Sequence, residues 1–451
     1  GRFDDALALI RQKNPFPGVL GRVCTHYCEY KCRRGQLDDP IAISYLKRFP
    51  ADVFYKKGKQ LMTLVAHARE EKVAIIGSGP AGLTAAYDLA RRGYKVTVFE
   101  ELPVAGGMMI VGIPDYRLPR DIVKAEVGII ERLGVEIRTN TRVGRDISFD
   151  EIRKGYDGVF IATGCHVSQK MGVEGEGIEG VYGGTEFLRA VNLGERIALD
   201  RDVVVVGGGN TAIDAARTAL RLGAANVTIL YRREQEDMPA HEEEVEEALD
   251  EGVHIRFLVA PKRIIGENGR VTKVECHGMA LGAFDRSGRR QPIPREGSTF
   301  TLKADVVIAA IGQVADLGFM NGAGKHLAPA GRVTVNADTQ ETALEGVFAG
   351  GDLVSGPWDI VNAVAAGHRA AEAIDGALRA QKGEPPWKEE FARFEIPVRI
   401  EEDIVERPRE RMPMLSPDAR STSFKEAQLG YTERMAMDEA TRCLRCDLEI
   451  D

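Results

Sequence analysis

The hydrophobic positions after Lys72 fall into short continuous runs, separated by longer segments with helical spacing. The runs have the length of buried strands, and the segments between them have the length of helices. Strands that alternate with helices in this way are typical of a parallel sheet covered by helices. We therefore predict strands over residues 73–76, 95–99, 203–206, 226–230 and 346–349, and helices over residues 80–92, 210–222 and 360–378.

One strand–helix–strand unit occurs twice along this part of the chain. In each copy a glycine-rich turn joins the first strand to the helix, and the copies lie about 130 residues apart. The distance from the first turn glycine to the end of the second strand is 23 positions for Gly77 to Glu100 and 24 for Gly207 to Tyr231. Because one such unit binds one dinucleotide, the repeat predicts two dinucleotide sites.

The two ends of the chain differ from this alternating pattern. Residues 1–60 carry 12 Lys or Arg against 6 Asp or Glu, and a helical start breaks at Asn14-Pro15. Beyond residue 380 the chain is polar and contains prolines, which indicates an extended arm or linker over residues 385–418. A last helix is predicted over residues 432–446.

Composition narrows the functional class. The formal net charge of −8 and the pI near 5.7 argue against a dedicated nucleic-acid binder. No apolar run approaches the roughly 18 residues of a membrane span, and no secretory signal is present, so we expect a cytoplasmic protein. The chain begins at Gly1 rather than at methionine, which leaves room for residues upstream.

The first glycine turn, residues 77–82, follows a strand and opens a helix. Its first glycine makes the tight turn, its second lets the backbone approach a pyrophosphate, and its third lets the helix pack on the strand. The helix N-terminus then faces the anion, and Glu100 at the next strand end accepts from ribose hydroxyls. The predicted contacts are Gly77, Ser78, Gly79, Pro80, Ala81, Gly82 and Glu100.

The second glycine turn, residues 207–212, is followed by a strand that ends in Tyr231-Arg232-Arg233 instead of an acid. Guanidinium groups at this place suit a 2′-phosphate, which favours NADPH over NADH. The alternative is a solvated arginine pair, with Glu234 accepting from an NADH diol. The predicted contacts are Gly207, Gly209, Asn210, Thr211, Arg232 and Arg233.

Two further strands, ending at Gly164 and Gly312, close on a small residue and a glycine. Such strands suit crossings between domains near a cofactor, although an ordinary buried strand fits equally well. Asp352 follows two glycines and precedes a helix start near Ile360. An aspartate there can reach a ribityl hydroxyl, and the helix N-terminus can stabilise a reduced flavin.

Five of the seven cysteines form two groups, Cys24, Cys28 and Cys32 near one end and Cys443 and Cys446 near the other. An odd number grouped in this way indicates metal ligation in a reducing compartment rather than disulfides. Thiolates are soft ligands suited to such a metal. A structural zinc site and unligated thiols are among the readings that stay open. Cys165 and Cys276 are expected to be buried or isolated thiols, and His26 a surface residue.

Two charged stretches carry weaker signals. Basic residues flank the N-terminal cysteines and have three possible roles: their charge tunes a negatively charged cluster, they dock an acidic partner, or they form a solvated face. These residues are Lys31, Arg33, Arg34, Lys47 and Arg48. The acidic run over residues 242–247 is expected to be an exposed helix face.

The full set of motifs resembles the small subunit of glutamate synthase and its relatives, which are flavoproteins with two dinucleotide sites. The similarity spans roughly residues 14–375. The motifs that carry it are the two glycine turns, Glu100, Gly106-Gly107, residues 112–119, Ala162-Thr163-Gly164, residues 231–233 with 238–240, and Gly350-Gly351-Asp352.

This resemblance implies an α/β fold with FAD and NAD(P) domains of Rossmann type, a small helical iron–sulfur domain before them and an extended C-terminal arm after them. The implied boundaries are 1–70 for the iron–sulfur domain, 71–178 and 312–380 for the FAD domain, 179–311 for the NAD(P)H domain and 381–451 for the arm. It adds Gly107, Arg117, Val143, Ala162, Thr163, Gly164, Gly312, Gly351, Asp352, Ile360 and Val361 to the cofactor contacts.

The resemblance also implies a function. Relatives pass electrons between NAD(P)H, FAD and a 4Fe-4S cluster to a catalytic or ferredoxin-like partner subunit. Some serve glutamate synthase, some are ferredoxin:NADP oxidoreductases, and some serve oxoacid dehydrogenases of the phenylglyoxylate dehydrogenase type. The earlier cysteine set of these relatives is absent here, so Cys443 or Cys446 is expected to complete the ligand set by folding back, or to join residues outside this chain. A thioredoxin reductase-like disulfide reductase and a cofactor-bearing scaffold are the alternatives.

Overall fold

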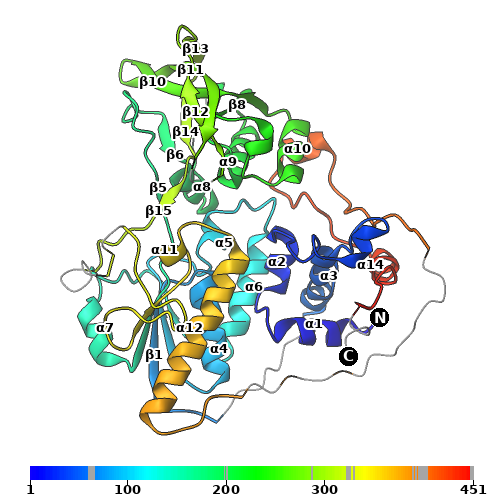
Figure 1. The fold of residues 1–451 in the computed structure, drawn as a ribbon, viewed down its shortest axis with the longest axis vertical. Coiled ribbons are helices and arrows are strands. Elements are labelled where there is room, and N and C mark those ends of the chain that lie inside the picture. The colour runs from blue at the N-terminus through cyan, green and yellow to red at the C-terminus, as the bar shows by residue number, and fades with distance from the viewer. Residues whose placement is uncertain are drawn as a thin grey trace.

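The computed structural model of the protein describes most of the chain (Figure 1). The described residues are 1–58, 67–197, 199, 202–285, 288–320, 327–328, 331–388, 391, 394 and 405–446. Among them, no helix is both long and apolar enough to cross a membrane.

The N-terminal segment is helical, as predicted. It contains α1 (Phe3–Arg11), α2 (Pro17–Val23), the short 3₁₀ helix η1 (Arg33–Gln36) and α3 (Ile43–Lys56). The break between α1 and α2 is fixed by Asn14, whose side chain accepts from the Phe16 N–H. The first turn of α2 donates the N–H groups of Gly18 and Val19 to the buried carboxylate of Glu126. These bonds dock the segment on the neighbouring nucleotide-binding fold.

The first nucleotide-binding fold contains a five-stranded parallel sheet with the strand order β16-β4-β1-β2-β3. Its strands are β1 (Lys72–Ile76), β2 (Lys95–Phe99), β3 (Glu136–Arg138), β4 (Gly158–Ile161) and β16 (Val347–Ala349). Its helices are α4 (Pro80–Arg91), α5 (Met108–Val111), α6 (Arg120–Glu131), α7 (Phe149–Gly155), α11 (Asp352–Ser355) and α12 (Ile360–Gln381). The long α12 lies along α4 on one face of this sheet (Figure 1). The hydrophobic runs of the sequence form the buried centre of this sheet.

The second nucleotide-binding fold repeats this plan, with the order β6-β14-β7-β8-β9 and all strands parallel. Its strands are β6 (Val181–Gly183), β7 (Asp202–Val206), β8 (Asn226–Tyr231), β9 (His254–Phe257) and β14 (Val306–Ala309). Its helices are α8 (Gly184–Asn192), α9 (Asn210–Arg221), the 3₁₀ helix η2 (Gln235–Asp237) and α10 (Glu242–Asp250). The predicted repeat of the strand–helix–strand unit is therefore confirmed.

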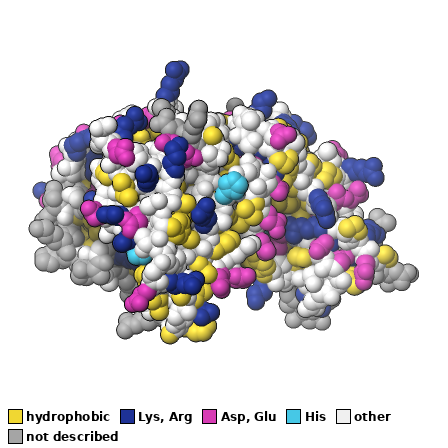
Figure 2. Space-filling model, turned by 90° about the horizontal axis from the view of Figure 1, so that it is seen from above, with side chains coloured by type: hydrophobic (Ala, Val, Ile, Leu, Met, Phe, Trp, Pro, Cys, Tyr) yellow, Lys and Arg dark blue, Asp and Glu magenta, His cyan; other side chains and the backbone are white. Residues whose placement is uncertain are grey.

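An antiparallel sheet extends the second fold at the end of the molecule farthest from α12 (Figure 1). The sequence analysis did not predict it. Its strands are β10 (Val259–Glu267), β11 (Arg270–Phe284), β12 (Arg290–Pro294) and β13 (Phe300–Lys303). Seen from this end, basic and acidic side chains are interspersed with hydrophobic ones (Figure 2).

Two short strands join the folds where the sequence analysis expected crossings. They are β5 (Val167–Ser168) and β15 (Gln313–Val314), which pair antiparallel just beyond Gly164 and Gly312. The chain therefore leaves and re-enters the first fold at one place.

The C-terminal arm folds back across the molecule to the N-terminal helices (Figure 1). Its described part contains α13 (Pro417–Ser421) and α14 (Glu433–Ala440). The predicted helix 432–446 is too long, because α14 ends before the cysteines. Much of the predicted extended stretch, residues 389–390, 392–393 and 395–404, lies outside the described residues.

Candidate functional site

Both glycine turns open into one large cavity of about 1350 Å³. Its wall includes residues from the first fold, the second fold, the N-terminal segment and the arm, so it lies where all four parts meet. Cys24, Thr25 and His26 line it on the N-terminal side, and Gln428 lines it from the arm.

The first glycine turn leaves the N-terminus of α4 free to hold an anion. The N-cap residue is Gly79, and no side chain caps the helix. A Cβ atom on Gly79 would meet nothing within 4 Å, whereas one on Gly77 would lie 2.6 Å from the Ala162 carbonyl oxygen. Gly77 also has a φ of 102°. A Cβ on Gly82 would lie 2.1 Å from the Gly77 carbonyl oxygen, so the third glycine permits the close helix–strand contact.

Glu100 lies at the cavity wall and is held by the glycine turn itself. One carboxylate oxygen accepts from the Ser78 N–H at 2.9 Å and from its hydroxyl at 2.5 Å, and the other accepts from the Leu102 N–H at 2.8 Å. Burial raises the pKa of Glu100, and these hydrogen bonds oppose the rise. The oxygen that accepts from Leu102 keeps a second lone pair, so the carboxylate can still accept from a ribose hydroxyl.

Asp352 and the start of α12 form the opposite side of the first site. Gly351 has a φ of 68° and places Asp352 at the first position of α11, where burial raises the pKa of its carboxyl to about 6. Asp359 caps α12 by accepting from the Asn362 N–H at 2.8 Å. The hydroxyl of Thr163, which also lines the cavity, is buried without a hydrogen-bond partner.

These features suit FAD. An open glycine cradle, an uncapped helix N-terminus, a carboxylate at the second strand end and an unpartnered buried hydroxyl meet the needs of a pyrophosphate, a ribose and a polar chain. The residues that would hold the flavin are therefore those of the first glycine turn, with Glu100, Thr163 and Asp352.

The second glycine turn has the same backbone plan with different side chains around it. Gly209 is the N-cap of α9, again without a capping side chain. A Cβ on Gly208 would lie 2.4 Å from the ring of Tyr231, so this ring packs directly on the turn. The Tyr231 hydroxyl donates to the Asp237 carbonyl oxygen at 2.6 Å, which fixes the ring there.

The two arginines after Tyr231 differ in exposure and in hydrogen bonding, although both line the cavity. Arg232 is exposed. Arg233 is only 4% exposed and donates to the Asp285 carboxylate at 3.0 Å and to the Arg290 carbonyl oxygen at 2.8 Å. Glu234 is exposed and is not among the residues that line the cavity.

The three N-terminal cysteines differ in their surroundings. Cys24 is at the cavity wall, and Cys28 is exposed. Burial raises the pKa of the Cys28 thiol, and the nearby Cys24 raises it further. In the described part of the chain, no three Cys, His, Asp or Glu side chains gather closely enough to hold one metal ion. Soft thiolates from Cys24 and Cys28 remain suitable donors for iron–sulfur iron.

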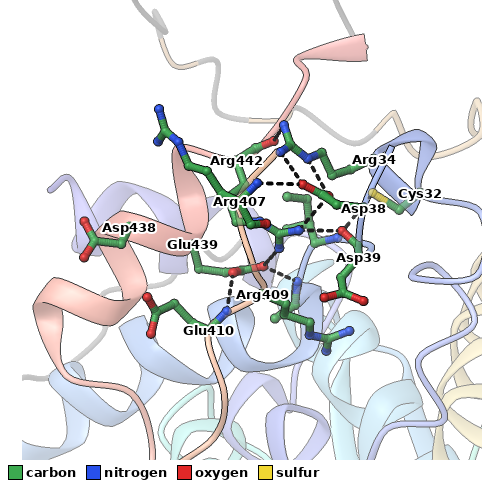
Figure 3. Close-up of polar contacts among 12 residues, drawn as sticks. Cys32, Arg34, Asp38, Asp39, Arg407, Arg409, Glu410, Asp438, Glu439 and Arg442 are labelled. Carbon is green, nitrogen blue, oxygen red and sulfur yellow. Dashed lines mark hydrogen bonds and ion pairs between the residues drawn. The ribbon is translucent and has the colours of Figure 1, made fainter. Parts of the chain in front are cut away.

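Ion pairs hold the end of the arm, which carries the C-terminal cysteines, against the N-terminal segment. We call this group of Arg34, Asp38, Glu439 and Arg442 the latch (Figure 3). Arg442 pairs with Asp38 at 2.9 Å and with Glu439 at 2.8 Å. Arg34 pairs with Asp38 and donates to the Arg442 carbonyl oxygen at 3.3 Å. Cys443 follows Arg442 directly, so the predicted return of the arm to the N-terminal region is confirmed. Ligation by Cys443 or Cys446 stays a prediction.

Two of the basic residues that flank the N-terminal cysteines are buried, which corrects the expectation of a solvated face or a docking surface for them. Arg34 and Arg48 are 4% and 2% exposed. Arg48 pairs with Asp52 and with Glu426 of the arm. These two arginines therefore join the arm to the N-terminal helices and form neither a solvated face nor a docking surface.

The acidic run of α10 is also more than an exposed face. Glu244 pairs with Arg117 at 2.6 Å and with Arg217 at 3.0 Å, and Glu247 pairs with Arg217 at 2.7 Å. Arg117 further contacts both oxygens of Asp214. Because Arg117 belongs to the first fold and the others to the second, these pairs fix the two folds against each other. The sequence analysis missed this joint because its partners lie far apart in the chain.

Most of the predicted cofactor residues meet at the cavity. Its wall includes Gly77, Ser78, Gly79, Pro80, Ala81, Glu100, Gly107, Arg117, Val143, Ala162, Thr163, Gly164, Gly207, Gly209, Asn210, Thr211, Arg232, Arg233, Gly312, Gly351, Asp352 and Ile360. Gly82 and Val361 lie outside it, as do Cys28, Cys32, Cys443 and Cys446. Sequence reasoning missed His166, two residues beyond Gly164, whose pKa burial lowers to about 4. It also missed Trp358 and Gln428.

Comparison with protein families now identifies the nucleotide-binding part. The family described as pyridine nucleotide-disulphide oxidoreductase matches residues 71–367. The chain belongs to this family. It is accordingly an oxidoreductase that uses FAD and NAD(P)H, as predicted. A second family, described as dihydropyrimidine dehydrogenase domain II, 4Fe-4S cluster, matches residues 1–59 of this oxidoreductase and confirms the predicted type of cluster.

Several curated relatives match the oxidoreductase over most of its length. The NADP(+)-dependent formate dehydrogenase subunit beta of Moorella thermoacetica is 46% identical, with 99% of this chain and 67% of the relative covered. The NADPH-Fe(3+) oxidoreductase subunit beta of Geobacter sulfurreducens is 41% identical, with 99% and 71% covered. The glutamate synthase [NADPH] small chain of Escherichia coli is 35% identical, with 83% of each covered. The resemblance to the glutamate synthase small subunit is thereby confirmed.

A solved structure supports the fold of the oxidoreductase. FprA of Mycobacterium tuberculosis in complex with NADPH is 20% identical and superimposes with a TM-score of 0.59 over 70% of this chain and 86% of that chain. At this identity the likeness concerns the fold alone.

Proposed function

We propose that this oxidoreductase is the electron-transfer subunit of a larger complex, which exchanges a hydride between NADPH and FAD and single electrons with a partner through its N-terminal iron–sulfur domain. The flavin supplies the change from two-electron to one-electron chemistry. The relatives named as subunits of formate dehydrogenase and of an Fe(3+) oxidoreductase support a partner subunit. Glutamate synthase and oxoacid dehydrogenases of the phenylglyoxylate dehydrogenase type stay predictions for that partner.

One observation carries this proposal: the two glycine turns and Cys24 line the same cavity. A nucleotide on each turn extends from opposite folds into a shared space, which suits the close approach that hydride transfer needs. On another side of that space, the Thr25 hydroxyl lies 3.5 Å from Asp359, the N-cap of α12. The segment that carries Cys24 and Thr25 therefore lies next to α12, the helix that begins at the flavin site.

The chain's own residues contribute position and charge. The joint formed by Arg117, Asp214 and Glu244 sets the angle between the folds. The N-termini of α4 and α9 have no side-chain cap and would hold the two pyrophosphates. Hydride transfer between a bound NADPH and a bound FAD would need no residue of this chain as acid or base.

For the cluster we propose Cys24, Cys28 and Cys32 as ligands, with Cys443 or Cys446 completing the set. The latch supports this, since it holds the residue before Cys443 against Arg34, two positions after Cys32. Neither Cys443 nor Cys446 is among the residues that line the cavity, so the disulfide-reductase alternative, which needs a dithiol near the flavin, gains no support.

The test is anaerobic reconstitution of the full chain with FAD, iron and sulfide, followed by reduction with NADPH. We expect bound iron and sulfide in the wild type and an electron paramagnetic resonance signal of a reduced cluster. Cys24→Ser should lose that signal and keep the flavin, and Cys276→Ser, a buried thiol on β11, is the matched control. Full iron content and signal in Cys24→Ser would overturn the cluster assignment.

A further inference from the structure

The nucleotide site of the second fold has a wall that the strand–helix–strand unit does not supply. In that unit, the residues after β8 are placed to read the ribose 2′ position. The two residues at the ends of the β11–β12 connection lie at the same place, because Arg233 donates to the Asp285 carboxylate at one end and to the Arg290 carbonyl oxygen at the other. The antiparallel sheet thus reaches the nucleotide site through Arg233.

The guanidinium of Arg233 is already bonded to Asp285 and Arg290. Its guanidinium is 4% exposed and bonds both sides of the connection. A group that is buried and already paired is poorly suited to receive a phosphate, since it would have to give up the Asp285 carboxylate. Arg233 therefore positions the connection.

Arg289 belongs to the connection that Arg233 holds. Its backbone exchanges hydrogen bonds with Asp285, at 2.7 Å from the Asp285 N–H to the Arg289 carbonyl oxygen and at 3.3 Å from the Arg289 N–H to the carboxylate. Its side chain lines the cavity together with Arg232. It also lies close enough to Tyr231, which packs on the second glycine turn, for its charge to lower the pKa of that phenol against the larger effect of burial.

We infer that Arg289 and Arg232 form the 2′-phosphate subsite of the second fold, with Arg233 and Asp285 as positioning residues. Two guanidinium groups, one from the end of β8 and one from the residue that precedes β12, line the same cavity and suit a doubly charged phosphate. This inference rests on the proposed use of NADPH and deepens it, because it assigns the selectivity to a part of the chain outside the repeated unit.

The experiment measures binding of two probes to the oxidised, flavin-loaded full chain by calorimetry. Adenosine 2′,5′-bisphosphate carries the 2′-phosphate, and adenosine 5′-monophosphate lacks it. We expect Arg289→Ala and Arg232→Ala each to weaken the bisphosphate by about 10-fold to 100-fold and to leave the monophosphate unchanged. Arg289→Lys should recover part of the loss.

Arg290→Ala is the matched control. Its side chain donates to the Leu281 and Gly282 carbonyl oxygens within the sheet, and it does not line the cavity. It should bind both probes as the wild type does. Asp285→Asn should weaken the bisphosphate alone, by about 3-fold to 10-fold, because the connection is then held less firmly.

Two results would overturn the inference: unchanged bisphosphate binding in Arg289→Ala, or equal weakening of both probes. The proposed function fails in a different way, if neither NADPH nor NADH reduces the wild-type flavin. A wild type that is reduced equally well by both would keep the function and refute the subsite.

Discussion

The two strand–helix–strand units share their backbone and differ at one point, the end of the second strand. In the first unit this point is Glu100, which folds inward and accepts from Ser78 and Leu102. In the second it is Tyr231 with two arginines, one exposed and one buried in contact with the antiparallel sheet. The first point is an anion held by its own turn, and the second is a cationic region held by a neighbouring sheet.

On the proposed assignment, this difference lets one fold take two nucleotides. The glycine turns and uncapped helices would bind what FAD and NADPH have in common, the pyrophosphate. The strand ends would bind what differs, since a carboxylate accepts from a ribose diol and guanidinium groups bind a 2′-phosphate. The predictions below test the two halves of this comparison.

The largest effect on nucleotide binding is expected when the first glycine of either turn is replaced by alanine. A Cβ at Gly77 would lie 2.6 Å from the Ala162 carbonyl oxygen, and one at Gly207 would lie 2.2 Å from that of Ala310. Gly77→Ala should therefore purify without flavin, whereas Gly207→Ala should stay yellow and not be reduced by NADPH. Gly134→Ala is the control, because that glycine has a φ of 92° but meets nothing within 4 Å. The opposite pattern of losses would exchange the assignments of the two sites.

The joint between the units is expected to contribute the next largest effect. Arg117→Met leaves Asp214 buried without its partner, which should cost about 3–5 kcal/mol of unfolding free energy. Urea unfolding of the flavin-loaded protein measures it through flavin release. Arg145→Met removes an exposed pair with Asp146 and should cost far less, because exposed ion pairs contribute little to stability. Equal losses in the two variants would show that the buried pair does not fix the folds.

Glu100 should matter for one nucleotide only. Glu100→Ala removes the acceptor of Ser78 and Leu102 and of the ribose, so FAD should bind more weakly by about 1.5–3 kcal/mol, or roughly 10-fold to 100-fold. Flavin fluorescence measures this, with Glu131→Ala on the exposed face of α6 as control. Binding of adenosine 2′,5′-bisphosphate at the second site should not change, and a parallel loss there would mean that the variant disturbs both units.

The smallest effect concerns pH. In the flavin-depleted protein the Asp352 carboxyl has a pKa of about 6, which is above its value in the unfolded chain. The folded state thus holds this proton longer, and its contribution of about 1–2 kcal/mol is present below about pH 4 and is lost as the pH rises to 6. Asp352→Asn should lack this slope, so the difference in melting temperature between the wild type and the variant should change between pH 4 and 6. A difference that does not depend on pH would contradict this prediction.

The sequence predicted the repeated units well because their signals are local. Within the two repeated units, every positive φ falls on a glycine, and each buried strand is one hydrophobic run. The arm's return could not be predicted in detail, since Arg442 and Asp38 meet across 404 positions. For the same reason Glu244 was expected to be solvated, although it pairs with Arg117 of the other fold.

The central claim is that NADPH on the second unit reduces a flavin on the first. Anaerobic mixing of the flavin-loaded protein with NADPH, followed by flavin absorbance, tests it most directly. The account predicts that stoichiometric NADPH bleaches the flavin, and faster than NADH does. A flavin that stays oxidised with both nucleotides would contradict it.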